Sequence, residues 1–381
     1  MNLELLNDVF SSVKTTELYG RYITNSDIEK CLEKLPKSKI STLGYSVEKR
    51  PIYSLKFGHG PIKILLWSQM HGNESTSTKA LFDCFNLFET ENNFTKGILE
   101  QCTLVVIPIL NPDGAEKYTR LNANLVDLNR DAQNLSQPES KILRQAYDDF
   151  MPNYCFNLHG QRTIFSAGEK NNVATLSFLS PSQDEERSLT DNRKVAMAII
   201  AEINTVLQNE IPNGIGRYDD GFSLSCVGDT FQNLGVPTLL YEAGHYTNDY
   251  EREEVRRLMF IAILSGLFTI AKGVAIGGYK RYFDIPENAK CFYDIIIRDT
   301  KLKAGNTDLI DVAIQYEEVL VDKKLHFVPK IVKLEKLLNH FGHKEVDAKG
   351  RVFKTTGNSE LILGNEIVFA MLNNEEILLK P

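Results

Sequence analysis

Histidine and glutamate residues at strand ends are the first feature of this sequence that could do chemistry. In His71-Gly72-Asn73-Glu74, two residues separate an imidazole from a carboxylate, and we expect Gly72 to give this turn an unusual backbone angle. Hydrolytic zinc sites commonly use two histidines, one glutamate and an open position for water. His159, which ends another apolar run, would supply the third ligand. We therefore expect His71, Glu74 and His159 to bind one Zn²⁺ per chain; the alternative is that His71 is a buried structural histidine.

A second polar segment carries residue types that bind carboxylates. Asn129 and Arg130 are adjacent, and Arg120 precedes them in the same loop-like stretch. A planar guanidinium can donate two parallel hydrogen bonds to a carboxylate, and a neighbouring amide can add a third contact. The pair would suit an enzyme that recognises a terminal carboxylate. The alternative is a surface ion pair of Arg130 with Asp127 or Asp131.

Glu242 ends a further apolar run, Leu239-Leu240-Tyr241. A carboxylate in such a position is rarely buried without a partner or a purpose. Zinc lowers the pKa of a bound water from about 15.7 toward about 7, and a nearby carboxylate can then take its proton. The alternative is a structural ion pair between Glu242 and an arginine of the cleft.

These residues need a scaffold that brings strand ends together. Between Ile62 and Ala275, short apolar runs alternate with longer amphipathic ones, which predicts an α/β fold with a mixed central β-sheet flanked by helices. The candidate residues follow predicted strands, where the chemistry of such sheets gathers. The predicted strands are Ile62–Trp67, Thr103–Ile109, Tyr154–Leu158 and Pro237–Tyr241, and the predicted helices begin at Ser75 or span Pro138–Phe150, Asp191–Leu207 and Asp249–Ala271.

The pattern changes after Gly277-Gly278. Alternating apolar stretches separated by turn residues predict a small β-rich domain over residues 284–381, with one helix near Lys333–His340. Residues 1–278 would form the catalytic domain. The smaller domain could serve packing, assembly or the narrowing of access to the cleft.

Five separated motifs together resemble the M14 family of zinc metallocarboxypeptidases. They are HGNE, NPDG, VDLNRD, LHG and YEAG, they occur in this order over Ile62–Gly273, and an arginine lies upstream of VDLNRD. The resemblance implies zinc ligation by His71, Glu74 and His159. It also implies that Asn129 and Arg130 grip the substrate carboxylate, that Arg120 polarises the scissile carbonyl and stabilises the oxyanion, and that Glu242 is the general base.

The sequence departs from better-known members at the substrate side. Gly160 stands where many members have serine, and Arg162 follows as an added positive group near the substrate or as a structural residue. Tyr218 lies in the stretch where the mobile tyrosine of digestive members is expected, although a surface aromatic fits equally well. Gly228 would occupy the position that selects the terminal side chain. Asp229 could favour a basic side chain, but we interpret it as structural.

Composition narrows the function further. The net charge is −7 and no basic stripe occurs, which argues against nucleic-acid binding. The sequence shows no secretion signal or propeptide, and the longest apolar run, Phe260–Ala271, is too short to span a bilayer. We therefore expect a cytoplasmic metallocarboxypeptidase that uses a zinc-activated water on a peptide or N-acyl amino acid with a free carboxylate. The alternatives are a zinc-dependent deacylase or amidase of N-acyl amino acids or cell-wall peptides, and a non-catalytic binding module on the same fold.

Overall fold

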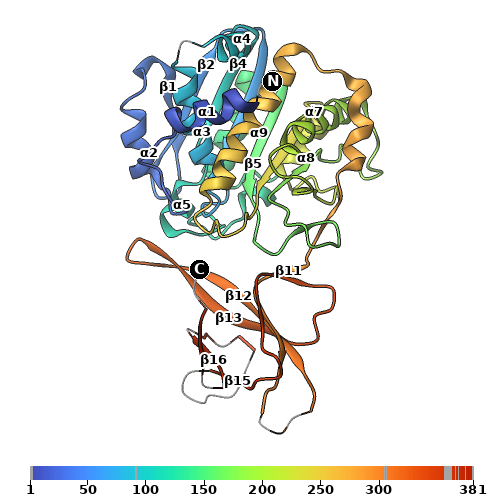
Figure 1. Ribbon diagram of the computed structural model, residues 1–381. Coiled ribbons are helices and arrows are strands. Elements are labelled where there is room, and N and C mark those ends of the chain that lie inside the picture. The colour runs from blue at the N-terminus through green and yellow to red at the C-terminus, as the bar shows by residue number, and fades with distance from the viewer. Residues whose placement is uncertain are drawn as a thin grey trace.

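An eight-stranded mixed sheet forms the centre of the N-terminal part of the chain (Figure 1). The structure is a computed structural model that describes residues 3–90, 92–303, 305, 307–355, 363–364, 366–367, 369–373 and 375–379. The strand order across the sheet is β1-β2-β4-β3-β5-β9-β7-β8. The strands are β1 (Ile40–Tyr45), β2 (Pro51–Gly58), β3 (Ile62–Ser68), β4 (Cys102–Ile107), β5 (Tyr154–Gly160), β7 (Leu176–Leu179), β8 (Ile215–Arg217) and β9 (Thr238–Ala243).

Helices cover both faces of this sheet because its central strands are apolar on both sides. In β3, Ile64 and Leu66 belong to one buried core, and Leu65 and Trp67 belong to the other. The first core includes α1, α2, α3, α4, α7 and α9, and the second includes α6 and α8. The helices are α1 (Leu3–Val13), α2 (Asn25–Leu32), α3 (Thr76–Phe88), α4 (Asn93–Gln101), α5 (Pro112–Lys117), α6 (Pro138–Phe150), α7 (Asp191–Leu207), α8 (Val227–Asn233) and α9 (Glu253–Lys272), with 3-10 helices η1 (Lys37–Lys39), η2 (Leu128–Arg130) and η3 (Ile276–Asp284).

Strands β4, β3, β5 and β9 run parallel, whereas β1, β2 and β7 pair in the antiparallel sense. The carboxyl ends of the four parallel strands therefore meet at one edge of the sheet. Register places His159 of β5 directly beside Glu242 of β9. The predicted α/β architecture with a mixed sheet is confirmed.

The C-terminal region is rich in β-strands, as predicted. One sheet has the order β13-β12-β11-β14, the other is β15-β16-β17, and a buried apolar core joins them. The predicted helix near Lys333–His340 is wrong: residues up to Glu335 pair with β12, and a turn follows, because cross-strand pairing outweighs the helix propensity of Lys, Leu and Glu. The strands are β11 (Phe292–Thr300), β12 (Ile310–Val321), β13 (Lys324–Glu335), β14 (Phe341–Asp347), β15 (Phe353–Thr355), β16 (Phe369–Leu372) and β17 (Glu375–Leu378).

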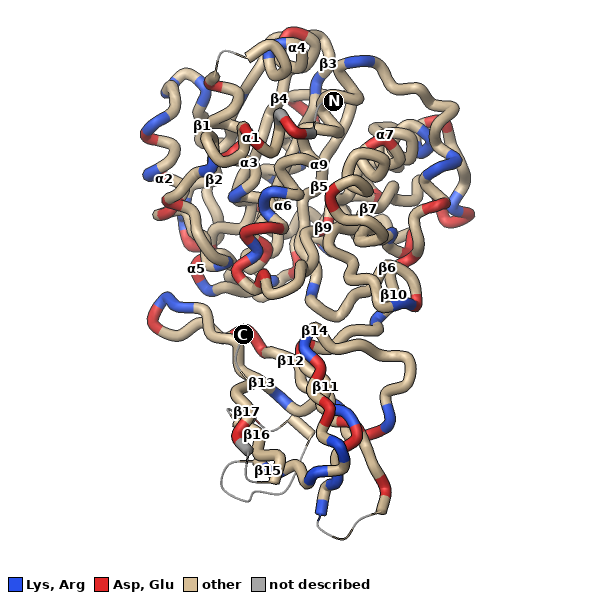
Figure 2. Tube along the Cα trace, in the orientation of Figure 1, with Lys and Arg blue, Asp and Glu red and all other residues tan. Residues whose placement is uncertain are grey.

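The two parts of the chain touch at the edge of the large sheet where the parallel strands end. Figure 1 shows the β12–β13 hairpin beneath α5, the helix that follows strand β4. A short pair of strands, β6 (Ser166–Ala167) and β10 (Asn288–Ala289), links the connecting segment to the N-terminal part. Basic and acidic residues are interspersed along both parts, without a stripe of one sign (Figure 2). Within the described residues, the helices are all too short or too polar to cross a membrane.

Candidate metal and substrate site

The candidate metal ligands come from three neighbouring structural segments. His71 follows β3, Glu74 lies in the turn that leads into α3, and His159 lies near the carboxyl end of β5. Because β3 and β5 are adjacent and parallel, their carboxyl ends bring the two histidines together. The pairing of these two strands therefore places His71 and His159 close together in space, although they lie far apart in the sequence.

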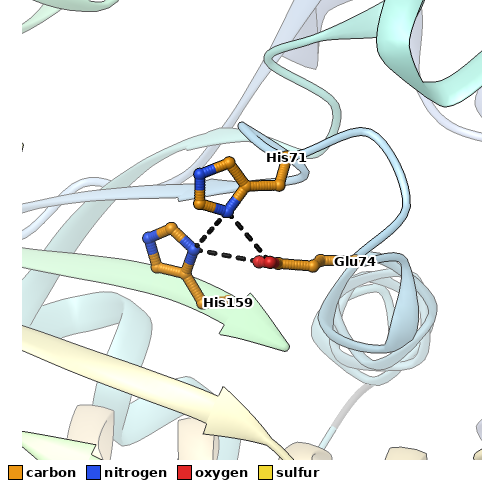
Figure 3. Close-up of side chains that lie close together, drawn as sticks. All are labelled: His71, Glu74 and His159. Atoms are coloured by element: carbon orange, nitrogen blue, oxygen red, sulfur yellow. Dashed lines mark hydrogen bonds and ion pairs between the residues drawn. The ribbon is translucent and has the colours of Figure 1, made fainter. Parts of the chain in front are cut away.

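Three ligand atoms converge at this point (Figure 3). The Nδ1 of His71 lies 2.9 Å from Oε1 of Glu74 and 3.1 Å from Nδ1 of His159, which lies 2.9 Å from Oε2 of Glu74. Tetrahedral zinc with bonds of about 2.1 Å needs ligand atoms about 3.4 Å apart. Both imidazoles are buried, and two nitrogens that face each other at such a distance need a cation or a proton between them. The donor set thus fits a zinc ion.

Charges inside the cluster are balanced through Glu74. Burial alone would raise the pKa of Glu74, but His71 and His159 lower it below its ordinary value. Burial lowers the pKa of His159 despite the hydrogen bond with Glu74. The neutral imidazole and the carboxylate that result are the protonation states in which these side chains bind a metal.

Asp127 contacts a candidate metal ligand, and the sequence did not single it out for this. Its Oδ1 lies 3.1 Å from Nε2 of His71, the ring nitrogen that faces away from the cluster. Burial would raise the pKa of Asp127, but the hydrogen bond with His71 and the charge of Arg120 keep it below its ordinary value. A carboxylate behind a ligating histidine fixes the tautomer and orientation of the ring. The sequence offered one signal, the position of Asp127 in the VDLNRD motif.

Glu242 lies beside the cluster with an unused oxygen. Its Oε2 is buried without a hydrogen-bond partner, and so is Nε2 of His159. Burial, and then the charge of Glu74, raise the pKa of Glu242 well above its ordinary value. Among the residues that the structure describes, no ion pair joins Glu242 to an arginine. The alternative of a structural ion pair for Glu242 is therefore wrong within this part of the chain. A buried, unpaired carboxylate beside a metal site is suited to exchange a proton.

Arg120 lies against the metal ligands. Its Nε is 3.0 Å from Oδ2 of Asp127, and its Nη1 is 3.6 Å from Oε1 of Glu74. The side chain remains 45% exposed, so one face of the guanidinium stays open to the cleft. The structure therefore places a cationic side chain next to the candidate metal ligands.

Asn129 and Arg130 lie at another part of the same cleft, on η2. The Oδ1 of Asn129 accepts a hydrogen bond from the amide of Val227, and Nη1 of Arg130 contacts Sγ of Cys226 at 3.1 Å. The ion pairs with Asp127 or Asp131 that offered an alternative for Arg130 do not form, because Asp127 binds His71 and Arg120. Asp131 instead accepts hydrogen bonds from Ser136 and Gln137. Arg130 is exposed and has a charge that a substrate carboxylate could meet.

The remaining predicted residues also line this cleft, which has a volume of about 700 Å³. Tyr218 is half-buried and packs edge-on against Phe165 at 5.4 Å, so it is not a surface aromatic. Burial and the charge of Glu242 raise its pKa. Arg162 is exposed at the rim. Burial raises the pKa of Asp229 to about 6, and this residue lines the cleft next to Gly228.

The sequence did not reveal the cleft residues that come from far along the chain. Arg21, Tyr316, Glu317 and Glu318 line the same cavity as His71 and Glu242. Arg21 precedes α2, and the other three lie on β12 of the C-terminal region. No local motif marks them, because their position depends on how the two parts of the chain pack.

The structure is an α/β protein with a His-Glu-His group that could hold a metal ion. Residues 25–153 match the model of the zinc carboxypeptidase family, a stretch that includes His71, Glu74 and Arg130 and ends before His159. The resemblance to the M14 zinc carboxypeptidases is thereby confirmed, and with it the class of hydrolase to which this chain is related.

Individual relatives agree with the family match. Carboxypeptidase SOL1 of Arabidopsis thaliana is 32% identical over 168 residues, which cover 38% of this chain and 34% of that protein. Carboxypeptidase D of Mus musculus is 32% identical over 162 residues, 35% of this chain and 12% of that protein. The chain thus matches only about a third or less of the length of these relatives.

Solved structures share the fold at low sequence identity. A metallo-carboxypeptidase from Pseudomonas aeruginosa, solved in complex with (2-guanidinoethylmercapto)succinic acid, superimposes with a TM-score of 0.54 at 18% identity, over 66% of this chain and 69% of that one. A metallo-carboxypeptidase from Burkholderia cenocepacia gives a TM-score of 0.52 at 19% identity, over 65% of this chain and 70% of that one. These similarities support the architecture of the large sheet and its helices.

Proposed function

We propose that this protein is a zinc-dependent metallocarboxypeptidase that hydrolyses the last amide bond of a substrate with a free terminal carboxylate. The observation that carries the proposal is the convergence of two histidine Nδ1 atoms and a glutamate beside the unpaired carboxylate of Glu242. The family match and the two relatives support it. Both relatives are named as carboxypeptidases, and we extend that activity to this chain as part of the proposal.

The side chains of the cleft have complementary roles in this reaction. Zinc held by His71, Glu74 and His159 would supply Lewis acidity and would lower the pKa of a water molecule. Arg130 and the amide group of Asn129 would bind the terminal carboxylate. Arg120 would donate hydrogen bonds to the carbonyl oxygen as negative charge develops on it.

Glu242 would carry the proton. It would take a proton from the attacking water while the new bond between that oxygen and the carbonyl carbon forms. It would then give this proton to the amine nitrogen as the bond between carbon and nitrogen breaks. The products would be a shortened acid and a free amino acid, with Glu242 returned to its starting state.

A metal analysis paired with a substrate panel tests the proposal. The purified chain is loaded with zinc, dialysed and analysed for zinc per chain, and then offered dipeptides with free or amidated ends beside N-acyl amino acids. We expect one zinc per chain and cleavage only where the terminal carboxylate is free. Cleavage of N-acyl amino acids alone would move the activity to deacylation, and the absence of both metal and turnover would leave a binding module.

Replacement of the proposed base gives a sharper prediction. Glu242→Gln keeps the shape of the side chain but removes its ability to accept a proton, so turnover should fall by about 10²–10⁴-fold while zinc stays bound. Glu186→Gln, at an exposed position that does not line the cleft, is the matched control and should behave like the parent. A Glu242→Gln variant with near-normal turnover would remove Glu242 from this role.

A further inference from the structure

The β12–β13 hairpin of the C-terminal region forms part of the cleft that holds the metal ligands. Tyr316, Glu317 and Glu318 of β12 line the same cavity as His71 and Glu242. Figure 1 shows the hairpin beneath α5, and α5 follows the carboxyl end of β4. The C-terminal region is therefore a wall of the candidate active site, contributed by residues far along the chain.

Hydrogen bonds and an ion pair fix this wall to the N-terminal part. Glu318 accepts a hydrogen bond from the hydroxyl of Tyr118 at 2.7 Å, and Nη1 of Arg21 lies 2.6 Å from its other oxygen. Burial would raise the pKa of Glu318, but the charge of Arg21 lowers it, so the pair is ionised. One residue of the wall is thus held by two separate segments of the N-terminal part.

Contacts made by two residues that precede Glu318 on β12 also hold the wall. The amide of Gln315 donates to the hydroxyl of Thr163 at 2.7 Å, a buried contact only four residues beyond His159. The ring of Tyr316 packs edge-on against Tyr250 at 5.2 Å. Buried polar contacts and aromatic packing of this kind resist rearrangement. The wall therefore has a fixed position relative to the metal ligands.

The wall and the residues that would hold the terminal carboxylate are fixed by different segments of the N-terminal part. Asn129 and Arg130 are held by Val227 and Cys226, whereas the wall is held by Arg21, Tyr118 and Thr163. A substrate whose carboxylate lies on Arg130 sets its scissile carbonyl at the metal site. The acyl side of the substrate must then continue into the remaining part of the cleft, which the hairpin lines.

We infer that Tyr316, Glu317 and Glu318 limit the length of the acyl side, so that the protein acts on dipeptides and N-acyl amino acids rather than on long peptides. This inference rests on the proposed function and names its substrate class. The cleft volume of about 700 Å³ lies in the range of about 300–1,000 Å³ that encloses small molecules. Glu317 is exposed and pairs with Lys330 of β13 at 2.9 Å, so the wall presents the charged side chain of Glu317 to an incoming chain.

A length series measures the effect of the wall. The substrates are a dipeptide, a tetrapeptide and a hexapeptide with the same two C-terminal residues, and the reported quantity is the ratio of kcat/KM for hexapeptide and dipeptide. We expect this ratio to be below one tenth for the parent, to rise at least fivefold in Glu317→Ala, and to fall further in Glu317→Trp. Val321→Ala, at the exposed far end of the same strand, is the control and should keep the parent ratio.

Calorimetry separates failure of this inference from failure of the proposed function. The zinc-loaded Glu242→Gln variant, alone and combined with Glu317→Ala, is titrated with the same three peptides. Weaker binding of the hexapeptide than of the dipeptide, relieved by Glu317→Ala, supports the wall even if turnover is never seen. Equal binding or equal kcat/KM for the short and long peptides in the parent would overturn the inference while leaving a carboxypeptidase activity in place.

Discussion

Asp127 connects a metal ligand to the segment that carries the arginines of the cleft. It accepts a hydrogen bond from Nε2 of His71 and forms an ion pair with Arg120. Replacement by asparagine keeps the acceptor oxygen but removes the charge that makes His71 a stronger ligand. We expect Asp127→Asn to raise the dissociation constant for zinc by about 10–100-fold, measured by competition with a chromophoric chelator.

The control for this variant is Asp191→Asn, because Asp191 is a highly exposed aspartate at the start of α7. The unfolding midpoints of both variants are also measured with the metal removed, which separates the effect on the ligand from an effect on the fold. An unchanged zinc affinity in Asp127→Asn would mean that His71 is oriented by its own strand end alone.

At the residue scale, sequence reasoning proposed three candidate ligands whose side chains the structure brings together, and it missed the acidic residues that contact a candidate ligand or hold the cleft wall. His71, Glu74 and His159 could be proposed because zinc limits ligand types and because each follows an apolar run. The roles of Asp127 and Glu318 depend on contacts between segments that are far apart in the chain. Their side chains are ordinary acidic residues, so nothing local distinguishes them from solvated ones.

At the scale of elements, the turn between β3 and α3 packs on the start of α5. A Cβ atom at Gly72 would lie 1.9 Å from the carbonyl carbon of Gly114 and 2.1 Å from the amide nitrogen of Ala115. The backbone of Gly72 is not in the left-handed region, so the prediction that Gly72 adopts an unusual backbone angle is wrong. Glycine is required here by the close approach of another backbone, and the HGNE and NPDG motifs are packed against each other.

This close approach predicts the effect of a single methyl group. Gly72→Ala must push the turn away from α5, which should cost about 1–3 kcal/mol of stability and separate His71 from Glu74. The variant should therefore lose both thermal stability and bound zinc, measured by calorimetry and by metal analysis. Gly97→Ala is the control: a Cβ there meets no atom within 4 Å, and it lies inside α4, so it should stabilise the protein by up to about 1 kcal/mol.

Elements with a strong local pattern could be predicted, and those without one could not. Apolar runs located β3, β4, β5 and β9, because strands buried on both faces read as continuous hydrophobic segments. The N-terminal helices α1 and α2 were not predicted. Residues 333–335 carry helix-forming side chains but pair with residues 311–313 of β12, and the sequence does not reveal which strand will offer such a partner.

At the scale of the whole molecule, a histidine lies where the two parts of the chain meet. His343 of β14 binds the backbone oxygen of Thr163 through Nε2 at 2.8 Å, and its ring stacks on Phe292 at 4.7 Å and lies 4.2 Å from His245. Thr163 belongs to the loop that follows His159. The contact thus connects the C-terminal sheet to the segment that carries a metal ligand.

The charges around this contact set how it responds to acid. Burial, and then the positive charge of Arg252, lower the pKa of His343 to about 4. Burial and the neighbouring His343 and Arg252 also lower the pKa of His245. Burial raises the pKa of Asp294 to about 6, which acts in the opposite sense, because the folded protein binds that proton more tightly than the unfolded chain does.

The direction in which His343 makes stability depend on pH follows from the difference between its pKa values in the folded and the unfolded chain. The unfolded chain takes up a proton near pH 6.5, whereas the folded protein resists it until about pH 4. The contribution of the neutral ring to stability is therefore complete above about pH 6.5 and is lost as the pH falls toward 4. Between pH 7.5 and pH 5, this residue alone should account for about 2 kcal/mol.

His343→Gln keeps an N–H group that can reach Thr163 but cannot be protonated, so it should remove this part of the acid sensitivity. Urea unfolding at pH 7.5 and at pH 5 measures this acid sensitivity as a difference between the parent and the variant. The effect of Asp294 cancels in this difference, whereas the change in the neighbouring His245 is part of it. His59→Gln removes an exposed histidine that precedes β3. This control variant measures how much the loss of a histidine outside the contact changes the pH dependence of stability. The parent should lose more stability than His343→Gln over this range, and two parallel pH dependences would mean that the contact between the two parts opens before the ring is protonated.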